Sequence, residues 1–311
     1  MAVRYPAAVA RWLRRPLAAF ALLALAACRA EAPPPAPAGR APTAGPRAPA
    51  SRAPAADPRA ASEIAEPGQA HARPTAAAPA TKKAPAPRPE APPAYEAVTF
   101  VTKGAAAGDR LPLVIAIHGL GDRPNRFARA LRGLDTPARV VAPAAPTPWH
   151  EGGSWFPVRA RDPDIAALAR GVAAAADDLA AFIRATAQQH PTRGKPIVTG
   201  FSQGGILSFA VAVRHPDLVA GAIPVGGLLP EPLYPKRPPE RPVPIVALHG
   251  ADDTVVAFDR AQATVDHLRS LGWPVRLVPF AGVGHAIPQP VHRAWLDTLA
   301  AACEGRWDVA R

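Results

Sequence analysis

Two short motifs that commonly mark a cofactor site are missing from this sequence of 311 residues. There is no H-E-x-x-H zinc motif, and there is no G-x-x-x-x-G-K-S/T phosphate-binding loop. Cysteine, which often binds metals, is also scarce, because Cys28 and Cys303 are the only two. The sequence therefore implies neither a metal ion nor another cofactor.

The sequence also lacks a stripe of basic residues interleaved with aromatic ones, although its formal net charge is +12. Four positive charges precede residue 28. Residues 29–94 hold nine Lys or Arg against five Asp or Glu, a net charge of +4, so residues 95–311 carry the remaining +4. Nucleic-acid binding requires basic residues gathered on one face. We therefore do not expect a nucleic-acid partner.

Residues 1–28 have the layout of an export signal, in which basic residues up to Arg15 precede an apolar run at 17–27. This run is too short to span a bilayer as a helix. Its end, Leu25-Ala26-Ala27-Cys28, resembles the bacterial lipobox, whose Cys is acylated and becomes the mature N-terminus. We expect export to the cell envelope with a lipid anchor on Cys28. Arg29 after the Cys favours the outer membrane in a Gram-negative cell, and an ordinary secretory signal or an uncleaved anchor is the alternative.

Residues 29–94 contain 17 prolines and no aromatic residue. Such a composition buries too little apolar surface to offset the entropy of ordering, so we expect a disordered linker. It would tether the remaining residues, 95–311, at a distance from the anchor. With Cys28 carrying lipid, Cys303 would have no intramolecular disulfide partner.

Residues 95–311 suit one α/β domain. The pattern predicts six strands and four helices: strands at 113–117, 139–142, 197–199, 222–225, 243–248 and 275–280, and helices at 164–189, 203–214, 258–271 and 289–301. The strand segments lack polar alternation, as buried parallel strands do. Their alternation with helices indicates a mostly parallel sheet with helices on both faces. We see no insertion long enough for a large lid domain, so we expect an open cleft that favours short-chain esters.

The segment Gly200-Phe201-Ser202-Gln203-Gly204 lies between a predicted strand and a predicted helix. This is the context of the G-x-S-x-G nucleophile elbow of the α/β-hydrolase fold. Small neighbours allow the strained turn that lifts the serine hydroxyl above the sheet. The pattern therefore predicts Ser202 as a nucleophile, and a Gly-rich structural turn is the alternative.

A serine hydroxyl needs a base, and this fold supplies the acid and the base after later strands, in that order. Of the nine histidines, only His285 follows both a strand and a candidate acid in a Gly-containing loop. Either Asp252 or Asp253, which share the loop after the strand at 243–248, could be that acid. The oxyanion hole would use the backbone N–H groups of Gln203 and Leu120. A plain strand–helix connection is the alternative for the Leu120 loop.

Several segments together resemble the phospholipase/carboxylesterase family that includes acyl-protein thioesterases. The matching segments cover most of residues 98–300 in the order of the family: His118-Gly119-Leu120-Gly121-Asp122, Ser154-Trp155-Phe156, Gly200-Phe201-Ser202-Gln203-Gly204-Gly205, His249-Gly250-Ala251-Asp252-Asp253 and Gly284-His285.

The resemblance implies that the fifth residue of the H-G-x-x-D segment, Asp253, is the triad acid, and it supports Leu120 as an oxyanion donor. It also places Trp155 near the substrate cleft, either lining the acyl pocket or packing beneath it. Two features depart from the family: Ala257 stands where members usually have Pro, and residues 228–242 form a Pro-rich loop that could reshape the pocket rim.

These residues together predict a serine hydrolase that cleaves carboxylic esters or thioesters of small-molecule or acylated substrates through an acyl-enzyme intermediate. Two alternatives stay open. The same chemistry could act on feruloyl or acetyl groups linked to polysaccharide, or the fold could serve as the scaffold of a non-enzymatic envelope lipoprotein.

Overall fold

The computed structural model describes residues 95–157, 159–160, 162–238 and 240–309. The predicted leader (1–28), its Cys28 and the predicted linker (29–94) lie outside the described residues, so those predictions stay untested.

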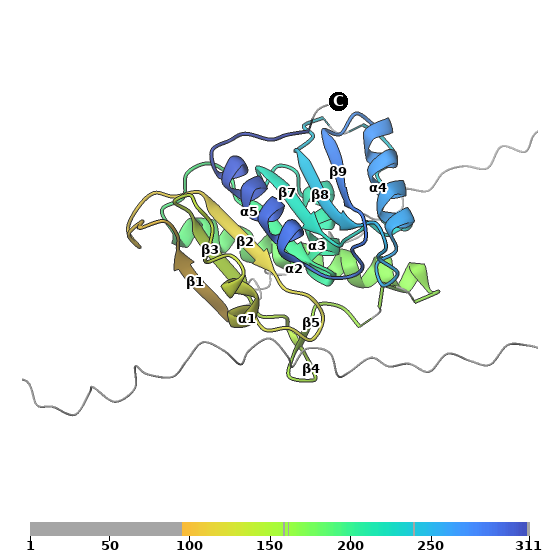
Figure 1. The fold of residues 1–311 in the computed structure, drawn as a ribbon, viewed down its shortest axis with the longest axis horizontal. Helices are drawn as coiled ribbons and strands as arrows, with labels where there is room; N and C mark the ends of the chain where they lie inside the picture. Colours follow the sequence, from red (N-terminus) through yellow and green to blue (C-terminus); the bar gives the residue numbers. More distant parts are fainter. Residues whose placement is uncertain (1–94, 158, 161, 239, 310–311) are drawn as a thin grey trace, which may run out of the picture. The chain divides into compact units, whose positions relative to one another are not determined.

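A seven-stranded sheet forms the centre of the described domain (Figure 1). Its strands lie in the order β1–β3–β2–β6–β7–β8–β9. Only the edge strand β1 runs antiparallel to its neighbour, β3, and the other strands pair in parallel. Their bounds are Ala97–Val101 (β1), Leu113–Ile117 (β2), Arg139–Pro143 (β3), Ile197–Phe201 (β6), Gly221–Val225 (β7), Ile245–Gly250 (β8) and Val275–Phe280 (β9).

Five α-helices complete the described domain: α1 (Pro124–Arg129), α2 (Ile165–Gln189), α3 (Gln203–Arg214), α4 (Phe258–Ser270) and α5 (Gln289–Cys303). A hairpin of β4 (Thr147–Trp149) and β5 (Gly152–Ser154) leads toward α2, and a short 3-10 helix, η1 (Glu231–Leu233), lies between β7 and β8. No helix within the described residues is long and apolar enough to cross a membrane.

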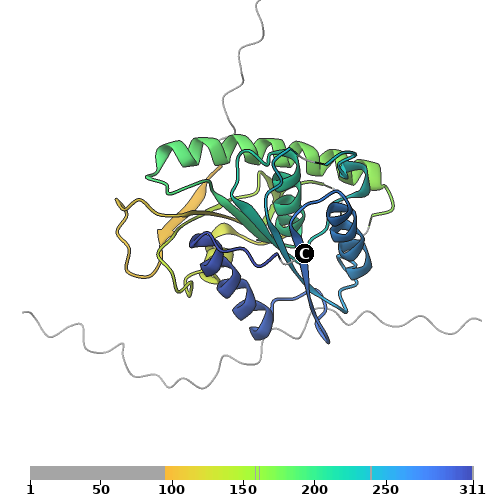
Figure 2. The same ribbon diagram turned by 90° about the horizontal axis from the view of Figure 1, so that it is seen from above.

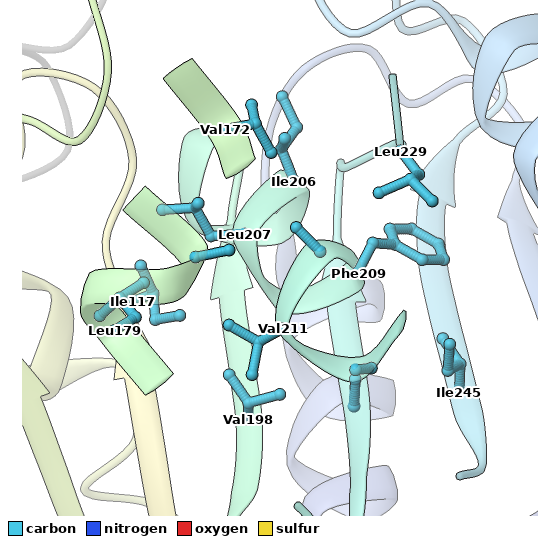
Figure 3. Close-up of a cluster of buried hydrophobic side chains, with 14 of the residues drawn as sticks. Ile117, Val172, Leu179, Val198, Ile206, Leu207, Phe209, Val211, Leu229 and Ile245 are labelled. Atoms are coloured by element: carbon cyan, nitrogen blue, oxygen red, sulfur yellow. The ribbon is translucent and has the colours of Figure 1, made fainter. Parts of the chain in front are cut away.

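The helices bury their apolar sides on the two faces of the sheet, as Figure 2 shows for α2 and α5 on opposite faces. Alternate residues of β2 divide between two apolar clusters, with Leu113 and Ile115 in one and Val114 in the other. The first cluster includes α2, α3 and α4, and Figure 3 shows part of it around Phe209. The second includes α1 and α5. Burial on both faces explains why these strands lack polar alternation.

The predicted α/β-hydrolase fold is confirmed. All six predicted strands and all four predicted helices are present, most of them within two residues of the predicted bounds. The described residues between β7 and β8 contain η1 as their one helix or strand, and this connection is too short for a large lid domain. The pattern did not predict β1, α1 or the β4–β5 hairpin. β1, α1 and each strand of the hairpin are six residues or shorter, and they lie outside the strand–helix alternation that identified the predicted strands of similar length.

Candidate active site

Ser202 lies in the sharp turn between β6 and α3, with φ 57° and ψ −117°. A non-glycine residue rarely adopts positive φ, and such strain persists only where the surroundings hold it. Here the Ser202 N–H donates to the Val225 carbonyl over 3.0 Å. A Cβ on Gly204 would overlap the carbonyl of Ile117, so only glycine allows α3 to approach β2 this closely. The predicted nucleophile elbow is therefore present as a backbone structure.

The His285 ring lies between Ser202 and Asp253. Its Nε2 is 2.8 Å from the Ser202 Oγ, and its Nδ1 is 2.7 Å from Oδ2 of Asp253. The ring also stacks on Phe201, with 4.7 Å between the ring centroids. Because an ionised carboxylate only accepts hydrogen bonds, the hydrogen lies on Nδ1 and leaves Nε2 to accept from the serine hydroxyl. This arrangement can remove the proton of Ser202.

Asp253 is buried, with 4% of its surface exposed, and accepts hydrogen bonds on both carboxylate oxygens. Oδ1 accepts from the backbone N–H groups of Val255 and Val256, each over 2.9 Å. Burial acts to raise the pKa of Asp253, but hydrogen bonds from His249, His285 and the Val256 N–H outweigh it and hold this pKa well below its usual range. Asp253 is therefore ionised at neutral pH. Its neighbour Asp252 is exposed, and the hydrogen bond that places it runs from its backbone N–H to the Val283 carbonyl.

His249, to which the sequence analysis gave no role, is a second histidine beside this acid. Its ring is buried, and its Nε2 lies 2.8 Å from the Val256 carbonyl and 3.3 Å from Oδ2 of Asp253. Because a carbonyl only accepts, Nε2 carries the hydrogen and shares it between the two oxygens. Its Nδ1 has no hydrogen-bond partner among the described residues. The H-G-x-x-D segment contained this residue, but spacing alone could not show its contact with the carboxylate.

The loop after β2 packs directly against Ser202. A Cβ on Gly119 would lie 3.3 Å from the Cβ of Ser202, so glycine brings this backbone close to the nucleophile. Leu120 and Gln203 line the same small cavity as Ser202. Within the described part of the chain, neither the Leu120 N–H nor the Gln203 N–H donates to another backbone group. Both are therefore available as the predicted oxyanion donors.

His118 anchors the base of this loop. Its Nδ1 donates to the Gly119 carbonyl over 2.8 Å, and its Nε2 accepts from the Ala145 N–H over 3.1 Å. Burial lowers the pKa of His118, outweighing the Gly119 carbonyl and the Asp122 charge, which both act to raise it. A neutral ring suits this site because protonation of Nε2 would remove the acceptor for Ala145.

Trp155 and the Gln203 side chain join this loop to the elbow. The Trp155 indole donates to the His118 carbonyl over 2.9 Å, and its backbone N–H donates to Oε1 of Gln203 over 3.0 Å. Nε2 of Gln203 in turn donates to the Phe156 carbonyl over 3.0 Å. The indole has 4% of its surface exposed and belongs to the apolar core. This placement favours the packing alternative for Trp155, and its contact with substrate stays a prediction.

The cavity beside Ser202 has a volume of about 260 Å³. Its lining residues are Leu120, Arg159, Ala160, Ser202, Gln203, Ile206, Val255 and Val256. Val255 is 43% exposed, the one large apolar side chain with that much exposure among the described residues. The described residues of the Pro-rich loop 228–242 do not line this cavity. Arg159 was not identified from the sequence, since no motif marks it.

Among the described residues, no group of three or more His, Cys, Asp or Glu side chains is placed to hold a metal ion.

Comparisons with known proteins agree with this fold. The family model described as Phospholipase/Carboxylesterase matches residues 101–300, from the end of β1 into the last turn of α5. A probable carboxylesterase of Oryza sativa subsp. japonica is 31% identical over 209 residues, which are 59% of this chain and 74% of that protein. Acyl-protein thioesterase 1 of Neurospora crassa is 28% identical over 199 residues, 56% of this chain and 79% of that protein.

Solved structures show the same architecture. Esterase PE8 matches with a TM-score of 0.57 and 25% identity, over 66% of this chain and 97% of that one. Zea mays acyl-protein thioesterase 2 matches with a TM-score of 0.55 and 21% identity, over 67% of this chain and 99% of that one.

Proposed function

The chain belongs to the phospholipase/carboxylesterase family and is a hydrolase of the carboxylesterase and thioesterase type. From this premise we propose that it cleaves carboxylic esters or thioesters through a Ser202–His285–Asp253 triad and an acyl-enzyme intermediate. The single observation that carries the proposal is the continuous chain of hydrogen bonds from Ser202 Oγ through both ring nitrogens of His285 to Asp253.

In the first half-reaction, His285 Nε2 accepts the Ser202 proton as Oγ attacks the acyl carbonyl. The negative charge that develops on the carbonyl oxygen is stabilised by the N–H groups of Leu120 and Gln203. Losing one such donor typically costs on the order of 100- to 1,000-fold in turnover. His285 then donates its proton to the leaving alcohol or thiol. In the second half-reaction, His285 activates a water molecule that releases the acid and restores Ser202.

The cavity supports a preference for short acyl chains. Its volume of about 260 Å³ lies below the range of roughly 300–1,000 Å³ typical of sites for drug-sized ligands. A chain much longer than the cavity must leave part of its apolar surface in water. We therefore expect kcat/KM to be highest for short acyl groups.

The test is hydrolysis of p-nitrophenyl esters from acetate to palmitate by the protein and by Ser202→Ala. The proposal predicts activity that peaks at short chains and that Ser202→Ala lowers by about 10⁴-fold or more. The Ser202→Ala protein should unfold within a few degrees of the parent, because the change removes one hydroxyl and keeps the backbone contacts. Activity that survives in Ser202→Ala would show that another group performs the reaction.

We further propose that residues 1–28 direct export to the cell envelope and that lipid on Cys28 holds the enzyme at a membrane, the outer membrane in a Gram-negative cell. The basic start, the apolar run of residues 17–27 and the following Cys28 support this proposal. Residues 29–94, rich in Pro and free of aromatic residues, would then keep the catalytic domain at a distance from the lipid.

The lipid is tested by growing bacteria that express the full chain with an alkyne-bearing fatty acid. The proposal predicts that the parent protein and Cys303→Ser incorporate the label and sediment with membranes, whereas Cys28→Ser does neither. Cys303→Ser is the matched control because it removes the other cysteine. A Cys28→Ser protein that keeps the label would overturn the assignment.

A further inference from the structure

Arg159 is the one charged side chain among the described residues that line a mainly apolar cavity. The cavity that holds Ser202 is lined on its other sides by Leu120, Ile206, Val255 and Val256, and no carboxylate lines it among the described residues. Arg159 forms no ion pair with any described residue, whereas several other arginines do. The cavity therefore offers a positive charge that nothing described in the protein neutralises.

Two contacts hold this part of the chain in place. The Arg159 guanidinium lies 5.6 Å from the centre of the Trp149 ring, an arrangement that attracts a cation to the face of the ring. On the next residue, the Ala160 carbonyl accepts a hydrogen bond from Nη1 of Arg260 over 2.8 Å. Trp149 belongs to β4 and Arg260 to α4, so the segment is fixed between two elements. The charge therefore has a defined position relative to the cavity.

The cavity lies on the acyl side of the scissile bond. His285 must donate a proton to the leaving group, so the leaving group lies next to its ring. Neither His285 nor Asp253 lines this cavity, whereas Ser202 and both proposed oxyanion donors do. A chain bound in the cavity thus extends from the carbonyl carbon away from the leaving group and toward Arg159.

We propose that Arg159 determines specificity by binding a carboxylate at the far end of the acyl chain, so that the preferred substrates are half-esters or half-thioesters of short dicarboxylic acids. The inference rests on the proposed function, because it names the substrate class of that same site. The chain's methylenes contact Leu120, Ile206 and Val255, and the terminal carboxylate pairs with the guanidinium. Because Arg159 is exposed, the pair contributes a preference of modest size.

The experiment compares two esters with the same leaving group and the same number of acyl carbons, p-nitrophenyl hexanoate and mono-p-nitrophenyl adipate. The measured quantity is the ratio of their kcat/KM values, adipate over hexanoate. We expect Arg159→Gln to lower this ratio about fivefold and Arg159→Glu to lower it further. Arg184→Gln, which removes one exposed arginine from α2 outside the cavity, should leave the ratio unchanged. Added salt should lower the ratio in the parent protein and not in Arg159→Gln.

A third substrate tests whether Arg159 binds a carboxylate on the acyl group or on the leaving group. In the hexanoate ester of 4-hydroxybenzoate, the carboxylate is on the leaving group. If Arg159→Gln affects this ester and not the adipate, the acyl-side assignment is wrong. If the protein hydrolyses hexanoate but its adipate ratio does not depend on Arg159, the inference is overturned and the proposed function stands. If it hydrolyses none of the three esters, both fail together.

Discussion

The side of Ser202 that faces His285 is a chain of hydrogen bonds that runs from the partly buried Ser202 and His285 to the buried Asp253, whereas the other side is a small cavity lined mainly by apolar side chains. The two regions meet in the turn after Asp253. There the backbone N–H groups of Val255 and Val256 bind the carboxylate, while their side chains line the cavity. Under the proposed function, this one turn would position the catalytic acid through its backbone and contact the acyl chain through its side chains. Side-chain substitutions in the turn after Asp253 should therefore alter the preference among acyl chains more than they alter the rate of catalysis.

The largest effect should separate two adjacent carboxylates on the polar side. Asp253→Asn should lower kcat by about 10⁴-fold, because an amide at this position favours the wrong tautomer of His285. Asp252→Asn should lower it no more than about twofold, since this side chain is exposed. Steady-state kinetics on a short p-nitrophenyl ester measures both. A large loss in Asp252→Asn with little change in Asp253→Asn would reverse the assignment of the acid.

A smaller effect should follow from removing the hydrogen that His249 shares with Asp253. In His249→Phe, Oδ2 of Asp253 keeps only His285 as a donor. We therefore expect kcat to fall about tenfold, which corresponds to about 1.4 kcal/mol and lies near the lower end for one hydrogen bond to a charged group. KM should be nearly unchanged. His249→Gln places an N–H near the position of Nε2 and should restore most of the activity. Thermal unfolding of each variant separates this positioning effect from loss of the fold. Equal activity in His249→Phe and the parent would show that Asp253 does not need this donor.

On the cavity side of Ser202, Val255→Trp should change the preference for acyl-chain length. Val255 is exposed, so the larger ring can be accommodated without repacking the core, and it should cover part of the cavity. We expect the kcat/KM ratio of hexanoate over acetate to fall about tenfold, the lower end of the range that one methylene contributes in an apolar pocket. The p-nitrophenyl ester series measures it. A ratio equal to that of the parent would mean that the acyl chain lies elsewhere.

Acid should remove the stabilising contributions of His118, below the Leu120 loop, and of Asp253, beside His285, at different pH values. The pKa of His118 is lower in the folded protein than in the unfolded chain. As pH falls below about 6.5, the unfolded chain therefore binds a proton at His118 before the folded protein does, and the free energy of unfolding decreases. The pKa of folded Asp253 is also lowered, so its contribution persists above about 3.9 and is lost only as pH falls further.

Unfolding temperatures measured from pH 8 to pH 3 should therefore fall in two steps. Each 1 kcal/mol lost shifts Tm by about 2–4 °C in a domain of this size. His118→Asn should make the upper step smaller and leave the lower one, with the remainder of the upper step due to His190, whose pKa burial also lowers. An upper step of unchanged size in His118→Asn would assign it to another group.

The parts of this molecule that could be predicted from sequence are those whose signal lies in consecutive residues. The strand β2 is a run of apolar residues, and the G-x-S-x-G segment contains both the serine and the glycines that its turn requires. The order of acid and base along the chain predicted His285 and left Asp252 and Asp253 as candidate acids, because parallel strands bring their ends to one edge of the sheet. The family resemblance then selected Asp253.

What the sequence did not reveal depends on contacts between distant segments. His249 was passed over because its position in the chain says nothing of the direction of its Nε2. The role proposed for Arg159 depends on the other residues that line the cavity, which come from the loop after β2, from the elbow and α3, and from the turn after Asp253. The resemblance predicted Trp155 near the substrate cleft, but only the fold shows that its indole donates a hydrogen bond to the His118 carbonyl.

The central claim is that Ser202 is the nucleophile and that His285 activates it. It is tested most directly by treating the protein with a fluorophosphonate and locating the adduct by peptide mass spectrometry. We predict one adduct, on the peptide that contains Ser202, and slow or absent labelling in His285→Ala. An active protein that is labelled elsewhere, or labelled on Ser202 equally fast in His285→Ala, would contradict the account.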